Sequence, residues 1–306
     1  MKVCYPEGWI TERSSGRRGY YSASELLDSV GKDEILESVA YMCDNDHNLL
    51  VDLGSMKGII PRCEGAIGIE EGTTRDIALI SRVGKAVCFT VSEIKHTTEG
   101  KPYALLSRRN AQMICKQNML ESCRPGDILN ARVTHLESFG AFCDIGAGDI
   151  ALLPIDSISV SRISHPRDRF SPGDDIRVII KQTENGRITL SHKELLGSWE
   201  ENAAMFSQGQ TVHGIIRSIE SYGVFVELAP NLAGLAESRS DVYVGQSTSV
   251  YIKSMIPEKM KIKLIIIDSF EADRKKEIEY FYKGDRIDRF VYSPERAEKK
   301  IETVFE

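Results

Sequence analysis

The chain has 306 residues, of which 42% are hydrophobic and 27% charged, and a formal net charge of −6. This composition is that of a globular protein and excludes a collagen-like repeat or wholesale disorder. The negative charge argues against wrapping of duplex DNA, where neutralised phosphates dominate affinity. It leaves single-stranded nucleic acid open, because bases also stack on aromatic side chains.

The sequence contains no feature that is typical of membrane insertion or secretion. No stretch approaches the ~18–20 consecutive apolar residues of a membrane helix, and residues 1–7 lack the apolar core of a secretory signal. We therefore expect a cytoplasmic protein with no membrane partner.

The seven cysteines lie at positions 4, 43, 63, 88, 115, 123 and 143 and include no C-x-x-C pair. Their odd number and wide spacing are typical of reduced thiols that pack as small hydrophobes. In a cytoplasmic chain this pattern predicts neither a disulfide frame nor a zinc site.

Residues 1–33 are expected to form an N-terminal tail and a short helix. The helix is predicted over residues 22–30, where Ser22 or Ser24 is placed to cap the first turn.

Three internal repeats follow, and the second is the clearest. It opens on Pro125-Gly126-Asp127, continues through Ser138–Gly146 and closes on Ile188–Ser191. The third repeat opens on Gly209, which lies 83 residues after Gly126, and follows the same order of motifs. The first repeat is eroded but legible, and His47 and Leu50 stand there at the positions of Phe139 and Phe142.

Each repeat holds about five short β-runs punctuated by glycine, which favours a small barrel over a helix-covered parallel sheet. The expected barrels cover residues 34–107, 123–193 and 208–268. Linker helices are expected over 108–122 and 194–207, since both segments have helical periodicity. The extension 269–306 is expected to hold a helix over 271–280, then a strand near 286–292 and a last short helix.

The repeats resemble the S1 (S-one) RNA-binding domain, the module of the large repeat protein of the small ribosomal subunit that also occurs in RNA-degrading enzymes. The resemblance rests on Phe139-Gly140-Ala141-Phe142, on the Gly-Asp or Gly-Gln before the fourth strand, and on the closing Ile188-Thr189-Leu190-Ser191. It covers roughly residues 34–268. It implies a mainly β fold of three tandem five-stranded oligonucleotide-binding (OB) barrels, joined by short helices, that bind single-stranded nucleic acid across one face.

The residue pattern supports such a face independently. Strand alternation places Phe142 on the opposite side from Ala141 and Cys143, and Phe225 repeats this pattern in the third repeat. Aromatic rings beside several cations are the composition of a surface that stacks bases and tracks phosphates. The residues expected to form the RNA-binding face are Phe139, Phe142, Arg177, Lys181, Arg187, Tyr222, Phe225, Lys261 and Lys263.

The sequence departs from the family pattern at two positions of this face. A histidine often follows the third-strand glycine-hydrophobic pair in RNA-binding members, and Pro154 and Glu237 stand there instead. An acid often precedes the closing basic residue, and here Thr183 and Pro257 take its place. We therefore expect a low affinity for each barrel and reliance on linked sites.

Structural roles for the same rings are the alternative. Phe139 and Tyr222 would then pack on the turn between the first two strands, and Phe142 and Phe225 would be covered by a neighbouring barrel. No motif for phosphate cradling, zinc hydrolysis or a nucleophile elbow is present, so we expect no catalytic residues, no metal and no cofactor.

The sequence thus predicts an RNA-binding protein and no enzyme. Its expected partners are single-stranded messenger RNA and the small ribosomal subunit, where it would act in translation. Two alternatives stay open: an accessory or regulatory RNA-binding role in RNA decay, and protein docking through barrel one, which carries 7 basic and 11 acidic residues over 34–107.

Overall fold

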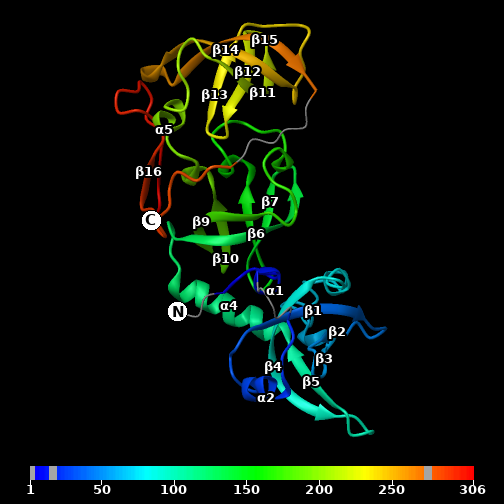
Figure 1. The fold of residues 1–306 in the computed structure, drawn as a ribbon. Helices are drawn as coiled ribbons and strands as arrows, with labels where there is room; N and C mark the ends of the chain where they lie inside the picture. The colour runs from blue at the N-terminus through cyan, green and yellow to red at the C-terminus, as the bar shows by residue number, and fades with distance from the viewer. Residues whose placement is uncertain (1–3, 14–18, 272–277) are drawn as a thin grey trace. The chain divides into compact units, whose positions relative to one another are not determined.

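The computed structural model describes residues 4–13, 19–271 and 278–306. The chain forms two compact units (Figure 1). Unit 1 comprises Met1–Cys123, Asn130–Arg132 and Asp144–Ile150, and unit 2 comprises Arg124–Leu129, Val133–Cys143 and Ala151–Glu306. Barrel one belongs to unit 1, barrel three belongs to unit 2, and barrel two supplies strand segments to both.

Three closed five-stranded barrels make up the body of the fold, which confirms the predicted mainly β architecture. Barrel one consists of β1 (Leu36–Cys43), β2 (Leu49–Asp52), β3 (Lys57–Ile60), β4 (Ala86–His96) and β5 (Pro102–Ser107). Barrel two consists of β6 (Ile128–Glu137), β7 (Gly140–Gly146), β8 (Asp149–Pro154), β9 (Asp175–Glu184) and β10 (Arg187–Ser191). Barrel three consists of β11 (Thr211–Glu220), β12 (Gly223–Ala229), β13 (Leu232–Ala236), β14 (Ser247–Ile256) and β15 (Lys261–Phe270).

The barrels share one strand order, in which the third strand pairs in parallel with the fifth and the first pairs with the second and fourth. Alternate residues fill each interior, as the period of two requires. Val224 and Val226 are fully buried in barrel three, and Ala141 and Cys143 are fully buried in barrel two.

In repeats two and three, the glycine that follows the first aromatic residue is required by close packing. A Cβ on Gly140 would fall against the carbonyl oxygen of Leu153, and one on Gly223 would fall against that of Ala236. This explains why the aromatic-glycine pair recurs at the start of β7 and β12.

Ahead of barrel one lie α1 (Trp9–Arg13) and α2 (Ala23–Ser29), and between barrels lie α4 (Arg108–Ser122) and α5 (Trp199–Ala203). A further helix, α3 (Ile77–Ile80), lies within barrel one in the connection from β3 to β4. Ser22 caps α2, where it forms a capping box with Glu25. α4 falls where the first linker helix is expected. Among the described residues, no helix is both long and apolar enough to cross a membrane.

The second linker differs from the single helix expected over 194–207. A 3₁₀-helix covers Lys193–Leu196, and α5 begins only after a break. The break lies at Gly197, whose φ of 83° is left-handed and ends a helical turn. Ser198 then caps α5 through a capping box with Glu201.

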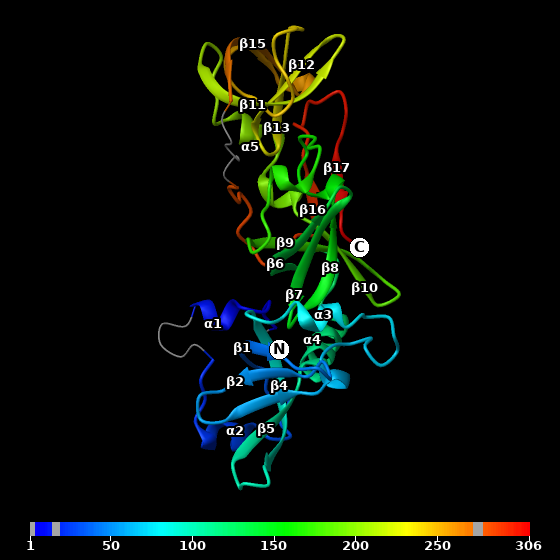
Figure 2. The same cartoon turned by 90° about the vertical axis from the view of Figure 1, so that its right-hand side faces the viewer.

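The C-terminal extension ends in strands and not in the short helix predicted from the sequence. β16 (Arg289–Val291) pairs antiparallel with β17 (Glu302–Val304). This pair lies against barrel two (Figure 1; Figure 2), where Ile287 and Phe305 join Ile179 and Leu195 in one buried cluster. The helix predicted over 271–280 falls mostly outside the described residues.

The prediction that all seven cysteines are reduced thiols is wrong for two of them. Cys4 and Cys115 form a disulfide across 111 residues of sequence, with their Cα atoms 5.7 Å apart. Spacing along the chain carries no trace of this pair, because the fold alone brings the N-terminal segment against α4.

Candidate nucleic-acid interface

The outer face of barrel three carries a row of paired residues that crosses three strands. Phe225 on β12 pairs with Leu235 on β13, and Leu235 pairs with Lys263 on β15. Paired residues lie on the same face of a sheet. The row therefore places an aromatic ring and a cation on one outer surface.

A second ring extends this surface. The rings of Tyr222 and Phe225 meet edge to face with their centroids 6.1 Å apart. Tyr222 is 67% exposed, and Phe225 is half-buried. Most of the Tyr222 ring surface is thus accessible to solvent, as stacking on a base would require.

The cations of barrel three are open to solvent. Lys261 and Lys263 are both exposed, and so is Lys253, which occupies the bulge of β14 opposite β15. The described residues form no ion pair with these three ammonium groups. The sequence-based set omitted Lys253, whose alternation with buried Ile252 in β14 was the available signal.

Barrel two repeats the aromatic pair. The rings of Phe139 and Phe142 meet edge to face at 5.9 Å, and Phe139 is 54% exposed. The ring of His135 stacks on Phe142 with centroids 6.3 Å apart. His135 was not among the predicted residues. The repeat spacing of 83 residues aligns it with Ser218, and Ser218 pairs with Phe225 in barrel three, so the alignment of the repeats was the available signal.

The predicted cations of barrel two have different surroundings. Arg187 is exposed, and the described residues form no ion pair with it. Lys181 donates a hydrogen bond to the hydroxyl of Ser157 at 3.2 Å. Arg177 donates to the backbone carbonyls of Tyr282 and Gly284 at 2.7 and 2.6 Å. Because the C-terminal extension occupies its guanidinium, Arg177 does not fit the predicted role of a phosphate contact.

Barrel one lacks the aromatic pair and carries an apolar row instead. Leu50 pairs with Met42 on one side and Ile59 on the other, and Ile59 pairs with Leu105. His47, at the position of the first aromatic, has a left-handed φ of 63° and lies 3.9 Å from the carboxylate of Asp76. The tyrosine rings of barrel one lie elsewhere: Tyr103 pairs with Lys57 two residues before Leu105 on β5, and Tyr41 of β1 is 43% exposed.

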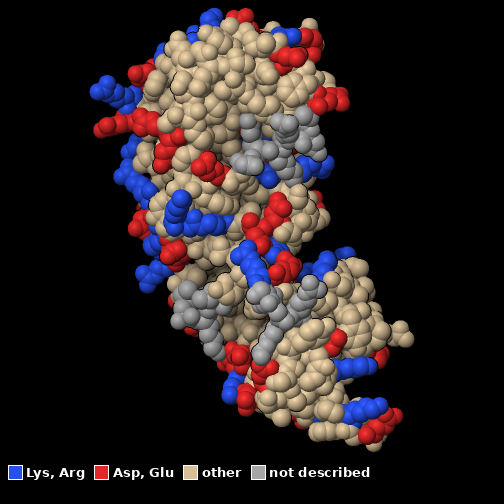
Figure 3. All heavy atoms as spheres, viewed as in Figure 1, with Lys and Arg blue, Asp and Glu red and all other residues tan. Residues whose placement is uncertain are grey.

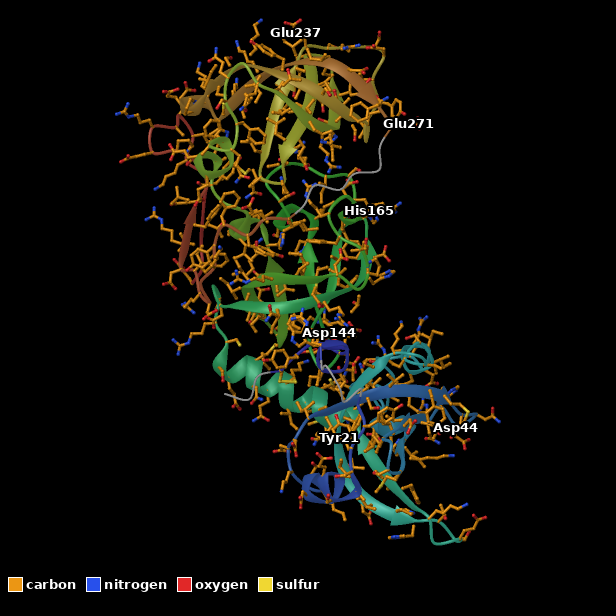
Figure 4. All side chains as sticks on the ribbon, viewed as in Figure 1. Tyr21, Asp44, Asp144, His165, Glu237 and Glu271 are labelled. Atoms are coloured by element: carbon orange, nitrogen blue, oxygen red, sulfur yellow. A yellow bond between two sulfur atoms is a disulfide. The ribbon has the colours of Figure 1, made fainter. Side chains whose placement is uncertain are left out.

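Charges of both signs are mixed on the face shown in Figure 3. Lys and Arg are interspersed there with Asp and Glu and form no continuous basic band. Glu237, which takes the position of the family histidine, is exposed after the end of β13 (Figure 4). Within the described part of the chain, no cluster of three or more His, Cys, Asp or Glu residues is arranged to hold a metal ion.

Comparison with known proteins places these barrels in context. Residues 123–193 match the family model of the S1 RNA binding domain. The small ribosomal subunit protein bS1 homolog of Bacillus subtilis (strain 168) is 29% identical over 273 residues, which cover 84% of this chain and 66% of that protein. The bS1 protein of Leuconostoc lactis is 27% identical over 237 residues, which cover 74% of this chain and 52% of that protein.

A solved structure also aligns with the chain, a multidomain protein with nucleic acid binding domains from Streptococcus pneumoniae. The alignment covers 78% of this chain and 75% of that chain at 16% identity, with a TM-score of 0.25. The chain spans between about half and just under two thirds of the length of these two bS1 relatives. The family resemblance of the sequence is thus confirmed: the chain is S1-like, and its residues 123–193 match the S1 RNA binding domain.

Proposed function

We propose that this chain binds single-stranded RNA on the outer faces of barrels two and three and acts in translation at the small ribosomal subunit. The observation that carries the proposal is the recurrence of one edge-to-face aromatic pair, an exposed ring against a half-buried one: Phe139 with Phe142 and Tyr222 with Phe225. Exposed rings at equivalent places of two barrels have no core to fill.

Stacking explains how a chain with a net charge of −6 holds a polyanion. Each base stacked on an aromatic ring contributes about 1–3 kcal/mol, and every base has a face to offer. Arg187, Lys253, Lys261 and Lys263 supply phosphate contacts beside the rings. Bases must be splayed to stack in this way, so the ligand is single-stranded.

The proposed role in translation is supported by the names of the two relatives, which are proteins of the small ribosomal subunit. By this proposal the chain works in the cytoplasm and holds messenger RNA near that subunit. The proposal assigns a binding function and no catalytic step, because rings and cations on an open barrel face bind a strand without activating a nucleophile.

A second role for barrel one is favoured by its apolar row of Met42, Leu50, Ile59 and Leu105. An apolar sheet face on a barrel with 7 basic and 11 acidic residues over 34–107 suits a protein surface better than a polyanion. Barrel one would then dock the chain while barrels two and three hold RNA.

The test is titration of a fluorescent single-stranded RNA with the full chain and its variants. Phe142→Ala and Phe225→Ala each remove one stack and should weaken binding by about 1–3 kcal/mol. Tyr20→Ala removes a ring of unit 1 that is 52% exposed and serves as the matched control, with unchanged affinity expected. Normal RNA binding by both phenylalanine variants, together with a marked loss of thermal stability, would show that these rings serve the fold.

The ribosomal part has a separate test. Sedimentation with purified small ribosomal subunits should recover the chain in the pellet. Recovery only in the supernatant, with RNA binding intact, would favour a role in RNA decay or regulation.

A further inference from the structure

A buried side chain at one end of barrel three contacts the backbone of segments that flank the strands of barrel two. Asn231 lies in the turn between β12 and β13 and is 0% exposed. Its Oδ1 accepts a hydrogen bond from the backbone N–H of Val160 at 2.9 Å. Its Nδ2 donates to the backbone carbonyls of Lys193 and Gly197 at 2.7 and 2.9 Å. Both donors of the amide are therefore committed to partners outside barrel three.

A buried ion pair makes a second connection close to this turn in sequence. Arg169, in the loop before β9, contacts Glu227 of β12 with Nη2 and Oε2 2.6 Å apart, and both side chains are 0% exposed. Arg217 of β11 shares that carboxylate, with its Nε 2.7 Å from Oε2. Asp168, beside Arg169, lies 3.5 Å from Arg217 and supplies a second carboxylate. Removing Glu227 would leave the buried Arg169 guanidinium without its ion-pair partner, so Glu227 holds the loop before β9 against barrel three.

The C-terminal extension contributes a third set of contacts, which are hydrogen bonds to the Asn231 turn, to α5 and to barrel two. Tyr292 donates its hydroxyl to the backbone carbonyl of Asn231 at 2.7 Å, and its own carbonyl accepts from the N–H of Trp199 at 2.9 Å. Earlier in the extension, the N–H of Ile287 donates to the carbonyl of Gly126 at 2.8 Å. The chain thus leaves barrel three, returns along barrel two and contacts the turn that holds Asn231.

We propose that barrels two and three bind one RNA strand as a single rigid unit, with this buried joint fixing the spacing of their two stacking faces. Rotation at the joint would strip the partners from a buried amide and from a buried charge, and both losses disfavour motion. With the spacing fixed, a strand held by one face meets the other at high effective concentration. The inference rests on the proposed function. It adds that the RNA ligand must be long enough to contact both stacking faces at once.

Strand length provides the binding test. One OB barrel occupies about 4–16 nucleotides, so RNAs of roughly 6 and roughly 30 nucleotides separate one-face from two-face binding. We expect the longer strand to bind the full chain at least about 100-fold more tightly, as linked sites do. In Phe142→Ala or Phe225→Ala this advantage should vanish, while the short strand still binds through the other face. A purely proportional gain with length would overturn the inference and leave the proposed function intact.

The joint itself has a test that needs no RNA. In the full chain, NMR relaxation should give barrels two and three the same rotational correlation time. Asn231→Ala should separate the two values and remove the length advantage. Tyr292→Phe, which deletes one hydroxyl and leaves the ring, is the milder variant and should lower the advantage severalfold.

Tyr251→Phe is the control for the tyrosine variant, because Tyr251 is 36% exposed on β14 and lies outside the joint. Its length advantage should equal that of the unaltered chain. Independent tumbling of the two barrels in the unaltered chain would refute the joint, whatever the RNA affinities are. Failure of every RNA to bind would instead count against the proposed function.

Discussion

Asp144 accepts a hydrogen bond from the backbone N–H of Glu7 at 2.8 Å, and both residues are buried in unit 1, where Asp144 lies beside α1 (Figure 4). Glu7 also accepts from Arg108 at 2.6 and 2.9 Å. Burial by itself would raise the pKa of Glu7, but the positive charge of Arg108 outweighs this effect and keeps the pKa of Glu7 below its ordinary value. Burial, with the nearby charge of Glu7, raises the pKa of Asp144 to about 7.

This pair makes the stability of unit 1 depend on pH. The pKa of Asp144 rises from 3.8 to about 7 on folding, so between these values the folded state binds more protons than the unfolded state. The free energy of unfolding of unit 1 should therefore fall as pH rises from about 4 to 7. Asp144→Asn should remove this fall, measured by amide hydrogen exchange of α4 at several pH values. An unchanged pH profile in the variant would rule out Asp144 as its source.

His192 predicts the opposite trend in unit 2. Burial lowers its pKa from 6.5 to about 4, and its ring contacts the carbonyl of Ile158 and the hydroxyl of Tyr280. The unfolded state therefore binds the extra proton between these values, and the free energy of unfolding should rise from about pH 4 to 6.5. Amide exchange in β9 should show this rise, and His192→Leu should flatten it. His165→Gln, at a less buried histidine, is the control; loss of the rise in that variant alone would contradict the assignment.

Loss of the disulfide is predicted to lower the stability of unit 1 and to leave RNA binding unchanged. Cys4–Cys115 ties the N-terminal segment to α4, and Tyr5 in that segment accepts from the N–H of Ala147 at 2.9 Å. Cys115→Ser should lower the free energy of unfolding of unit 1 by about 2–4 kcal/mol, since the cross-link no longer restricts the unfolded chain. RNA affinity should stay the same, and Cys63→Ser, at an exposed thiol, should change neither.

Thiol counting checks the premise. The denatured chain should give 5 reactive thiols before reduction and 7 after it, because 2 of the 7 cysteines are joined. Seven thiols without reductant would mean that the pair is not oxidised.

The apolar row of barrel one predicts a separation of functions. Met42 is 45% exposed, and Met42→Lys would place a charge within that row. The variant should sediment less with small ribosomal subunits and should bind RNA as before. Leu27→Lys changes a residue of α2 that is 59% exposed and should have no effect on either. Equal loss in both variants would show that added charge, and not the row, is responsible.

The sequence was most informative where a contact is local. Repeated glycine and aromatic motifs predicted the barrels, and strand alternation separated Phe142 from buried Ala141 and Cys143. Such patterns arise from neighbours along one strand, so they appear in the residue order.

Contacts between distant segments left no such pattern. The Cys4–Cys115 disulfide and the capture of Arg177 by the carbonyls of Tyr282 and Gly284 join positions 111 and more than 100 residues apart. The break at Gly197 was in principle readable, because a glycine before a capping serine is a helix boundary signal. Periodicity over 194–207 masked it.

The measurement that tests the central claim most directly is a titration with single-stranded and duplex RNA of equal length at several salt concentrations. The exposed cations without a described ion pair on the two faces are Arg187, Lys253, Lys261 and Lys263. At about 0.7 for each neutralised phosphate, these groups predict a slope of log affinity against log salt of about −3 for the single strand. Stacking should leave the single strand clearly preferred over the duplex. Preference for the duplex, or a slope several times steeper, would contradict binding on the aromatic faces.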